Sequence, residues 1–399
     1  MASKINPAAK KAILIGAMCA ISYFAVYIAR NILSAVSPSL LEGGFFQKEE
    51  IGSLSSAYFI AYAVGQLING AIGDKIKAKY MISFGLFLAG VSNVIFPFII
   101  AFKPVTLTAY AASGFFLSMI YGPMTKIIAE NTEPHHATRC SLGYTFASFF
   151  GSPAAGILAV FLSWQAVFVT SGAILFLMAS VCFAAFTIFE RRGFIKYNQY
   201  DRPKSNDKTE GIRVLVQHRI IRFSIVSIIT GVVRTTVVFW MPTYFNDYLG
   251  YKSEDSAFIF TISTLIISLS AFIAVFIYEH LKRNMDLTIL LSFISAVLFF
   301  TLVFFINRPI LNVIFLVLAV LSSNCAASML WSRYCPSLRD TGMVSSATGF
   351  IDFVSYMAAS ASSKIFGGIV DTIGWSGLIL IWIGLMIAGV VTMLPGRKI

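Results

Sequence analysis

Acidic residues are scarce in this chain, and charge of either sign is low. Of 399 residues, 18 are Asp or Glu and 30 are Lys or Arg, so that charged residues make up 12%. A typical soluble domain has about 25% charged residues. Hydrophobic residues supply 57% of the chain, and its mean hydropathy is +0.80. This composition excludes an ordinary water-soluble domain and predicts an integral membrane protein.

Short enzyme and cofactor motifs are missing as well. The sequence has no Gly-Lys-Ser/Thr phosphate-binding loop, no His-Glu-x-x-His and no Cys-x-x-Cys, the motifs that hold nucleotides, zinc and redox disulfides. We therefore expect no cofactor, no metal and no enzymatic activity, and no transport driven by ATP bound to this chain. The cysteines show no metal-ligand spacing and no evident disulfide pairing, which indicates small apolar filling residues: Cys19, Cys140, Cys182, Cys325 and Cys335.

Twelve apolar stretches are each long enough to cross a bilayer, which takes about 20 residues in a helix. They lie near residues 12–39, 50–72, 80–101, 105–129, 137–162, 164–189, 220–247, 255–280, 286–306, 309–332, 341–370 and 374–394. A long polar segment separates the sixth stretch from the seventh. The predicted fold is an all-α membrane protein with a six-helix half at 1–189, a cytoplasmic linker at 190–219 and a second half at 220–399.

The basic residues indicate how the chain is oriented. With both termini inside, the outer loops hold only Lys48, Lys103, Lys252 and Arg308, four more cations lie within spans, and the other 22 of the 30 lie in inner loops and tails. Basic residues gather on the cytoplasmic side of membrane proteins. The pattern predicts a plasma (bacterial inner) membrane protein with cytoplasmic termini, whose positive charge faces anionic lipid and not nucleic acid.

The two halves share an internal repeat. Arg30 is followed eight residues later by Pro38, and Arg234 is followed eight residues later by Pro242, at an offset of 204. A second pair of segments, "NGAIGDKIKAKY" and "AVFIYEHLKRNM", aligns at an offset of 205. Such repeats predict two homologous halves with parallel topology. Transporters built in this way bind their substrate near the bilayer midplane between the halves.

Two of the intramembrane cations, Arg30 and Arg234, hold equivalent places in this repeat. A charge at bilayer depth costs at least ~2.5 kcal/mol, and arginine cannot be neutralised in proteins. Asp352 is the only clearly intramembrane acid, so positive charge is left uncompensated. We expect the arginines to face each other across a central cavity and to bind an anionic substrate bidentately. The alternative is that each pairs with Asp352 or with backbone carbonyls and only holds helices together.

Three further groups belong to the candidate site. Tyr27 and Tyr23 share a helix face with Arg30. Their phenols either donate hydrogen bonds to the phosphate group and pack against the organic part of the substrate, or they are ordinary core aromatics. Lys126, towards the inner end of its span, either attracts phosphate or extends to the interface. Asp352 either couples protons and selects substrate or forms a structural pair.

At these residues the chain resembles the organophosphate:phosphate antiporters, the glycerol-3-phosphate and hexose-6-phosphate transporter family within the major facilitators. The likeness covers nearly the whole chain and is carried by "ISYFAVYIARNILSAVSPSLLEGGF", "AYAVGQLINGAIGDK", "VVRTTVVFWMPTYF" and "TGFIDFVSYMAASASSKIFGGIVDTIGWSG". The resemblance implies the major facilitator fold. It also implies that Arg30 and Arg234 bind the phosphoryl group and that Tyr23, Tyr27 and Lys126 belong to the same site.

The chain departs from this family at several positions near the implied site. Ser148 stands where the glycerol-3-phosphate branch has a histidine in helix 5, and Asp352 stands where the family often has a small residue. The helix 11 tyrosine of the family falls on Phe353, with Tyr356 one turn away. These differences concern the organic half of the substrate and leave both arginines in place.

The segment that closes the second span resembles the Gly-x-x-x-Asp-Arg/Lys loop signature of the major facilitators. Its residues here are Gly70, Asp74 and Lys75. A glycine lets helices approach closely, and an acid near a helix end caps or pairs with it. The resemblance implies a gating and structural role for this loop.

Together these observations predict a monomeric secondary transporter that exchanges an organophosphate, of the sugar phosphate or glycerol-3-phosphate class, for inorganic phosphate. The two halves would rock about the bound substrate to expose it alternately. One alternative is a proton- or sodium-coupled symporter of another organic anion, which Asp352 would permit. The other is a membrane receptor that binds a sugar phosphate without transporting it.

Overall fold

The computed structural model describes residues 7–73, 76–133, 136, 140, 143, 147, 150–197, 218–338 and 344–394. Within these residues the chain is almost entirely helical, which confirms the predicted all-α class. Packing divides the chain into two compact units. The first unit comprises Met1–Val36 and Ala57–Pro203, and the second comprises Ser37–Ser56 and Lys204–Ile399.

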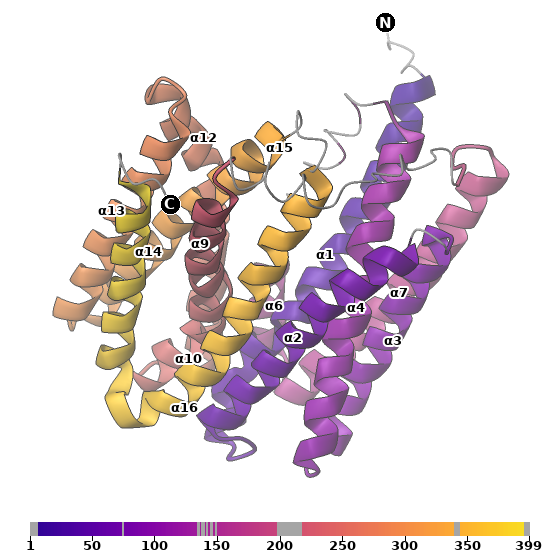
Figure 1. The fold of residues 1–399 in the computed structure, drawn as a ribbon. Coiled ribbons are helices and arrows are strands. Elements are labelled where there is room, and N and C mark those ends of the chain that lie inside the picture. Colours follow the sequence, from indigo (N-terminus) through magenta and orange to yellow (C-terminus); the bar gives the residue numbers. More distant parts are fainter. Residues whose placement is uncertain are drawn as a thin grey trace, which may run out of the picture. The chain divides into compact units, whose positions relative to one another are not determined.

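Among the described residues, the first unit holds the greater part of two long helices and four further helices. These are α1 (Pro7–Glu42) as far as Val36, α2 (Lys48–Gly73) from Ala57, α3 (Ala78–Ile99), α4 (Lys103–Asn131), α6 (Gly151–Phe161) and α7 (Trp164–Arg191). Helix α3 packs along both α4 and α7 (Figure 1). Phe96 of α3 stacks on Phe168 of α7 with ring centroids 4.0 Å apart, and both rings are fully buried. These two rings are therefore part of the core of this unit.

An ion-pair cluster joins the ends of α3 and α7. Glu190 accepts hydrogen bonds from Lys77, at 2.6 Å, and from Lys79. The hydrogen bond to Glu190 raises the pKa of Lys77, and burial raises the pKa of the neighbouring Tyr197 to about 12. These groups lie at the end of the unit that the charge pattern predicts to be cytoplasmic.

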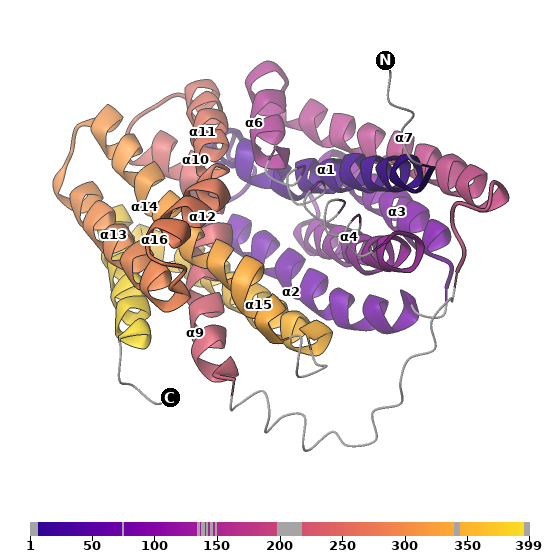
Figure 2. The same ribbon diagram turned by 90° about the horizontal axis from the view of Figure 1, so that it is seen from above.

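Among the described residues, the second unit holds two long interrupted helical paths and four other helices, besides the end of α1 and the start of α2. The first path is α9 (Ile220–Gly231), η1 (Val232–Val237) and α10 (Val238–Asp247), and the second is α14 (Pro309–Met329), η2 (Leu330–Tyr334) and α15 (Cys335–Ser337). The others are α11 (Ser253–Ile267), α12 (Ser270–His280), α13 (Met285–Phe305) and α16 (Val344–Met393). Helix α13 lies beside α14 and α16 (Figure 2), and α9 packs along α16. Both η1 and η2 are π-helical turns.

Ten helices among the described residues are long and apolar enough to cross a membrane. One of these, Ala347–Met393 in α16, includes two predicted spans, because Gly374 breaks its path with φ 67° and ψ 175°. Glycine adopts this backbone conformation without the strain that a Cβ would cause, and the two parts of α16 form a hairpin (Figure 1). The predicted span 137–162 is seen as the shorter α6, since much of it lies outside the described residues. The count of twelve is thus confirmed in part.

One boundary between the units, after Pro203, falls within the predicted linker 190–219, and the others fall within α1 and α2. The segment Ser37–Ser56, from the end of α1 to the start of α2, packs with the second unit. The boundaries of the two homologous halves were predicted from the sequence repeat, and they stay a prediction. All five cysteines are buried and none forms a disulfide among the described residues, in agreement with their interpretation as small apolar residues.

Candidate functional site

Arg30 lies in the unbroken part of α1 and is half-buried. Its Cζ lies 5.3 Å from the ring centroid of Tyr27, 5.3 Å from that of Phe59 and 5.4 Å from that of Tyr62. We call these three rings, one from α1 and two from α2, the aromatic cage. A cation–π contact contributes from about 0.5 to 2 kcal/mol, most when it is desolvated. The cage therefore offsets part of the free energy that a charge costs inside a membrane.

Further aromatic rings lie behind the cage. Tyr23 packs edge-on against Tyr27 at 4.9 Å and contacts the ring of Tyr121 of α4 at 5.7 Å. Tyr58 stacks on Tyr62 at 6.2 Å. The structure thus places Tyr23 and Tyr27 on the face of Arg30, where the helical spacing predicts them.

Gly151 of α6 determines how closely the neighbouring helix approaches this face. A Cβ at Gly151 would lie 2.2 Å from the Cβ of Tyr27 and 2.8 Å from its carbonyl carbon. Only a glycine permits this contact without a shift of the backbone, so α6 is seated against α1 one turn before Arg30. Ser148, the other predicted residue of this span, lies outside the described residues.

Arg234 lies in η1 and is half-buried. Its Cζ lies over the indole of Trp331, which belongs to η2, at 5.9 Å from the ring centroid. Within the part of the chain that the structure describes, Arg234 forms no ion pair and no hydrogen bond through its guanidinium. The alternative in which Asp352 neutralises Arg234 is therefore not what the structure shows. Single π turns inside α-helices occur frequently at functional sites.

Small residues bring the helical path of Arg234 against α16. A Cβ at Gly231, one turn before Arg234, would lie 2.2 Å from the Oγ of Ser355. One turn further along, the Oγ1 of Thr236 donates to the carbonyl of Ala359 at 3.0 Å. Helix α16 therefore runs directly beside η1.

Asp352 and Tyr356 lie in this flanking stretch of α16. Ser227 of α9 donates to the carbonyl of Ile351 at 3.0 Å, which is the residue before Asp352. Asp352 is half-buried and Tyr356 is buried. The structure thus places both on the helix that packs against Arg234's own, while their predicted contact with substrate stays a prediction.

Lys126 is half-buried in α4, and its Nζ lies 4.0 Å from the Oε1 of Glu130, one turn later. A pair of this kind along one helix is worth a few tenths of a kcal/mol, roughly 0.2–0.5. The predicted attraction of phosphate by Lys126 stays a prediction.

The loop signature after α2 is described only in part. Gly70 lies in the last turn of α2. Asp74 and Lys75 lie outside the described residues, and their implied gating role stays a prediction.

A polar latch binds the start of α2 to α10 and α16 within the second unit. The Nζ of Lys48 lies 2.8 Å from the Oδ2 of Asp247 and 2.9 Å from the Oδ1 of Asp371. The indole nitrogen of Trp375 donates to the same Oδ2 of Asp247 at 2.5 Å. Sequence reasoning counted Lys48 only as an outer-loop charge, because its two carboxylate partners are 199 and 323 residues away.

Hydroxyl pairs continue this contact along the helices. The pairs, each between two hydroxyl oxygens, are Ser37 with Thr243 at 2.8 Å, Ser55 with Ser363 at 2.8 Å and Ser56 with Ser360 at 2.9 Å. A Cβ at Gly52 would lie 2.6 Å from the carbonyl oxygen of Ser363. The connection between α1 and α2 is therefore bound closely to α10 and α16, the helices that continue from Arg234 and carry Asp352.

Three residues beside the arginines were not predicted. Phe59 and Tyr62 lie in the aromatic run "YFIAY" of α2, a signal that could have suggested a ring cluster but not its cation. Trp331 is a single tryptophan near the end of a span, and nothing in its sequence neighbourhood points to Arg234.

Comparisons with known proteins agree with this architecture. The family profile "Major Facilitator Superfamily" matches residues 19–363. The crystal structure of a D-xylose–proton symporter superposes with a TM-score of 0.73 at 14% identity, covering 96% of this chain and 97% of the other. That likeness shows the fold.

Curated relatives match over most of the chain. The glycerol-3-phosphate transporter of Bacillus subtilis is 22% identical over 396 residues, which is 93% of this chain and 89% of the relative. The phosphoglycerate transporter protein of Salmonella typhimurium is 23% identical over 394 residues, covering 90% and 82%. These relatives match the organophosphate:phosphate antiporter family that the motifs resemble. The chain therefore belongs to the Major Facilitator Superfamily, with transporters of phosphorylated compounds among its relatives.

Proposed function

We propose that this protein exchanges an organophosphate for inorganic phosphate across the plasma (bacterial inner) membrane, as a monomer with cytoplasmic termini. The observation that carries the proposal is Arg234, a permanent charge within a membrane-crossing helix that has no carboxylate partner among the described residues. The relatives that are named as transporters of glycerol-3-phosphate and phosphoglycerate support it.

The chemistry of the two arginines suits a phosphoryl group. A guanidinium donates in its own plane and matches phosphate oxygens in a bidentate arrangement. A phosphate monoester carries a charge of about −1.5 to −2 at neutral pH, which two arginines balance. We assign Arg30 and Arg234 to the phosphoryl group. Around it we place the remaining residues of the proposed site, namely Tyr23, Tyr27, Lys126, Ser148, Asp352 and Tyr356.

Obligatory exchange follows from the cost of unbalanced charge. Under this proposal the two halves rock about the site, and bringing two arginines through the occluded state without an anion is unfavourable. A bound dianion lowers that barrier. The change of access is therefore fast with substrate bound and slow when the site is empty.

Counterflow in proteoliposomes tests the proposal. Vesicles preloaded with phosphate are expected to take up radiolabelled phosphate, whereas empty vesicles are not, and Arg234→Gln should abolish the uptake. Competition by glycerol-3-phosphate, glucose-6-phosphate, phosphoenolpyruvate and 3-phosphoglycerate then identifies the organic moiety. Uptake that runs equally well into empty vesicles contradicts exchange, and binding without flux favours a receptor.

A second candidate function rests on Asp352, a half-buried acid within a membrane-crossing helix. A carboxyl group in such a place is suited to carry a proton. If the protein is a proton-coupled symporter of an organic anion, a pH gradient should drive uptake into vesicles without internal phosphate. Asp352→Asn should then abolish the dependence on the gradient, whereas in an exchanger it should leave phosphate counterflow in place.

A further inference from the structure

Two π-helical turns meet at Arg234. The arginine lies in η1 (Val232–Val237), and the indole over which its Cζ lies, that of Trp331, belongs to η2 (Leu330–Tyr334). A π turn includes an extra residue, so the side chains on it point in directions that a continuous α-helix would not give them. The contact between Arg234 and Trp331 therefore depends on both irregular turns.

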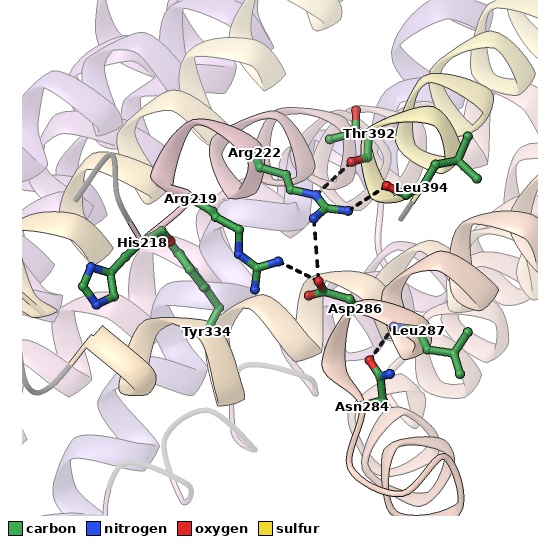
Figure 3. A network of polar contacts seen from close by, with 9 residues as sticks. All are labelled: His218, Arg219, Arg222, Asn284, Asp286, Leu287, Tyr334, Thr392 and Leu394. Carbon is green, nitrogen blue, oxygen red and sulfur yellow. Dashed lines mark hydrogen bonds and ion pairs between the residues drawn. The ribbon is translucent and has the colours of Figure 1, made fainter. Parts of the chain in front are cut away.

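The C-terminal end of η2 is fixed to the start of α9 (Figure 3). Tyr334, the last residue of η2, stacks on Phe223 of α9 with ring centroids 3.8 Å apart. Its hydroxyl donates to the carbonyl oxygen of His218 at 3.0 Å. Trp331 lies three residues before this anchor, and Arg234 lies eleven residues after Phe223. The two π turns are thereby tied together within one unit.

The cluster in Figure 3 also secures α9 itself. Arg219 forms an ion pair with Asp286 at 2.7 Å. Arg222, which is buried, donates through Nε to the carbonyl oxygen of Thr392 at 2.9 Å, in the last turn of α16. The start of the helical path that carries Arg234 is therefore bound to both α13 and α16.

The contact with an indole suits a cation that must bind an anion. The ring attracts the guanidinium through the negative potential of its face. The five N–H groups of the guanidinium lie in its own plane, so a ring that attracts the cation does not use up these donors. A long arginine side chain loses rotamer freedom when it is ordered. A ring that orders it before the anion arrives reduces this cost of binding.

We propose that Trp331 is a positioning residue for Arg234, holding the guanidinium in place so that its donors are free for a phosphoryl group. The inference rests on the proposed function and deepens it. Trp331 acts through Arg234 and does not itself bind the phosphate. It therefore affects how tightly both the organophosphate and inorganic phosphate bind.

A graded series at position 331 tests this role. In purified full-length protein in proteoliposomes, Trp331→Phe keeps a weaker ring, whereas Trp331→Leu removes the ring. We expect the KM for inorganic phosphate to rise about threefold in the first variant and about tenfold in the second, with kcat changing less than about twofold. The matched control is Tyr278→Leu. It removes another cation–π contact made from η2, that of Arg333 at 4.7 Å, and should leave the KM unchanged.

The outcomes separate this inference from the proposed function. A wild-type protein that neither binds nor exchanges phosphate overturns both. A wild-type protein that exchanges phosphate overturns the role of Trp331 alone if both variants keep the wild-type KM, or if only kcat and protein yield fall. The rise in Tm caused by added phosphate is a second readout, which should shrink in the order Trp, Phe, Leu. Should Trp331→Leu not fold, the Phe variant still decides: a wild-type KM and Tm rise overturn the proposal.

Discussion

Arg30 and Arg234 occupy equivalent places in the sequence repeat, but their surroundings differ. Arg30 lies in a continuous α-helix and contacts three rings from two helices. Arg234 lies in a π turn and, among the described residues, contacts one indole, which belongs to another π turn. The repeat places a cation eight residues before a proline in both halves, and the two halves hold that cation by different means.

The difference predicts unequal tolerance to change. The cage around Arg30 is redundant, since the loss of one ring leaves two others. Arg234 depends on one ring, whose position depends in turn on the backbone of η2. We therefore expect the surroundings of Arg234 to be the more sensitive of the two, although both arginines should be equally necessary.

The largest effect is expected from removing either charge. Arg30→Gln and Arg234→Gln should each lower phosphate exchange by about 100-fold, because each loses a set of charge-assisted hydrogen bonds to the anion. Counterflow rates in proteoliposomes measure this, with the exposed Arg308→Gln as the control. If one of the two glutamine variants keeps wild-type exchange, the paired role of the arginines is wrong.

The next effect concerns the glycines one turn from each arginine. Gly151→Ala meets the backbone of Tyr27, whereas Gly231→Ala meets mainly the Oγ of Ser355. Overpacking typically costs about 1–3 kcal/mol, and a hydroxyl rotates away more easily than a backbone moves. We expect both variants to lower the Tm in detergent, Gly151→Ala by more.

Two glycines with open space serve as controls for that comparison. A Cβ at Gly122 or at Gly349 meets nothing within 4 Å. Gly122→Ala and Gly349→Ala should therefore leave the Tm unchanged or raise it slightly, because alanine favours a helix by about 1 kcal/mol over glycine. Equal losses in all four variants would show that the close contacts at Gly151 and Gly231 have no special importance.

A smaller effect should come from opening the aromatic cage. Phe59→Leu removes one of the three rings around Arg30, and we expect it to raise the KM for phosphate by about twofold, against about tenfold for Trp331→Leu. The KM values from the same exchange assay make the comparison direct. A Phe59→Leu variant as impaired as Trp331→Leu would contradict the redundancy of the cage.

The smallest effect is expected at the anchor of η2. Tyr334→Phe keeps the ring stacked on Phe223 but removes the hydrogen bond to His218. A neutral hydrogen bond contributes about 0.5–1.5 kcal/mol, and only part of that should reach Trp331, so the KM should rise by less than the change of about twofold expected for Phe59→Leu. Cys335→Ser, at the next position, is a control that leaves the anchor intact. If Tyr334→Phe raises the KM for phosphate more than Trp331→Leu does, the anchor and not the indole of Trp331 is the main determinant of phosphate binding.

Several parts of this site could be predicted from local spacing. Tyr27 and Tyr23 follow from Arg30 by helical periodicity, and the structure places them on its face. Phe59 could have been suspected from the aromatic run in α2. Trp331 could not, because its contact joins residues nearly a hundred positions apart and depends on two π turns that no sequence pattern specifies.

The contacts of Lys48 could not be predicted from the sequence either, and they join residues that are still farther apart along the chain. Its carboxylate partners lie on α10 and α16, and an isolated lysine near a helix start gives no sign of either. Charge counting predicted only that Lys48 lies in an outer loop, and it gave no information on the contacts of its side chain.

Hydropathy, charge asymmetry and the repeat were sufficient to predict an all-helical membrane protein with an arginine in each half. These properties follow from the interaction of each segment with lipid and water, which is local and nearly additive along the chain. Tertiary structure alone decided which rings contact which arginine, where the π turns occur and what Lys48 binds. Such contacts depend on how helices distant in sequence pack together, and a change of one residue in helical register redirects every side chain involved.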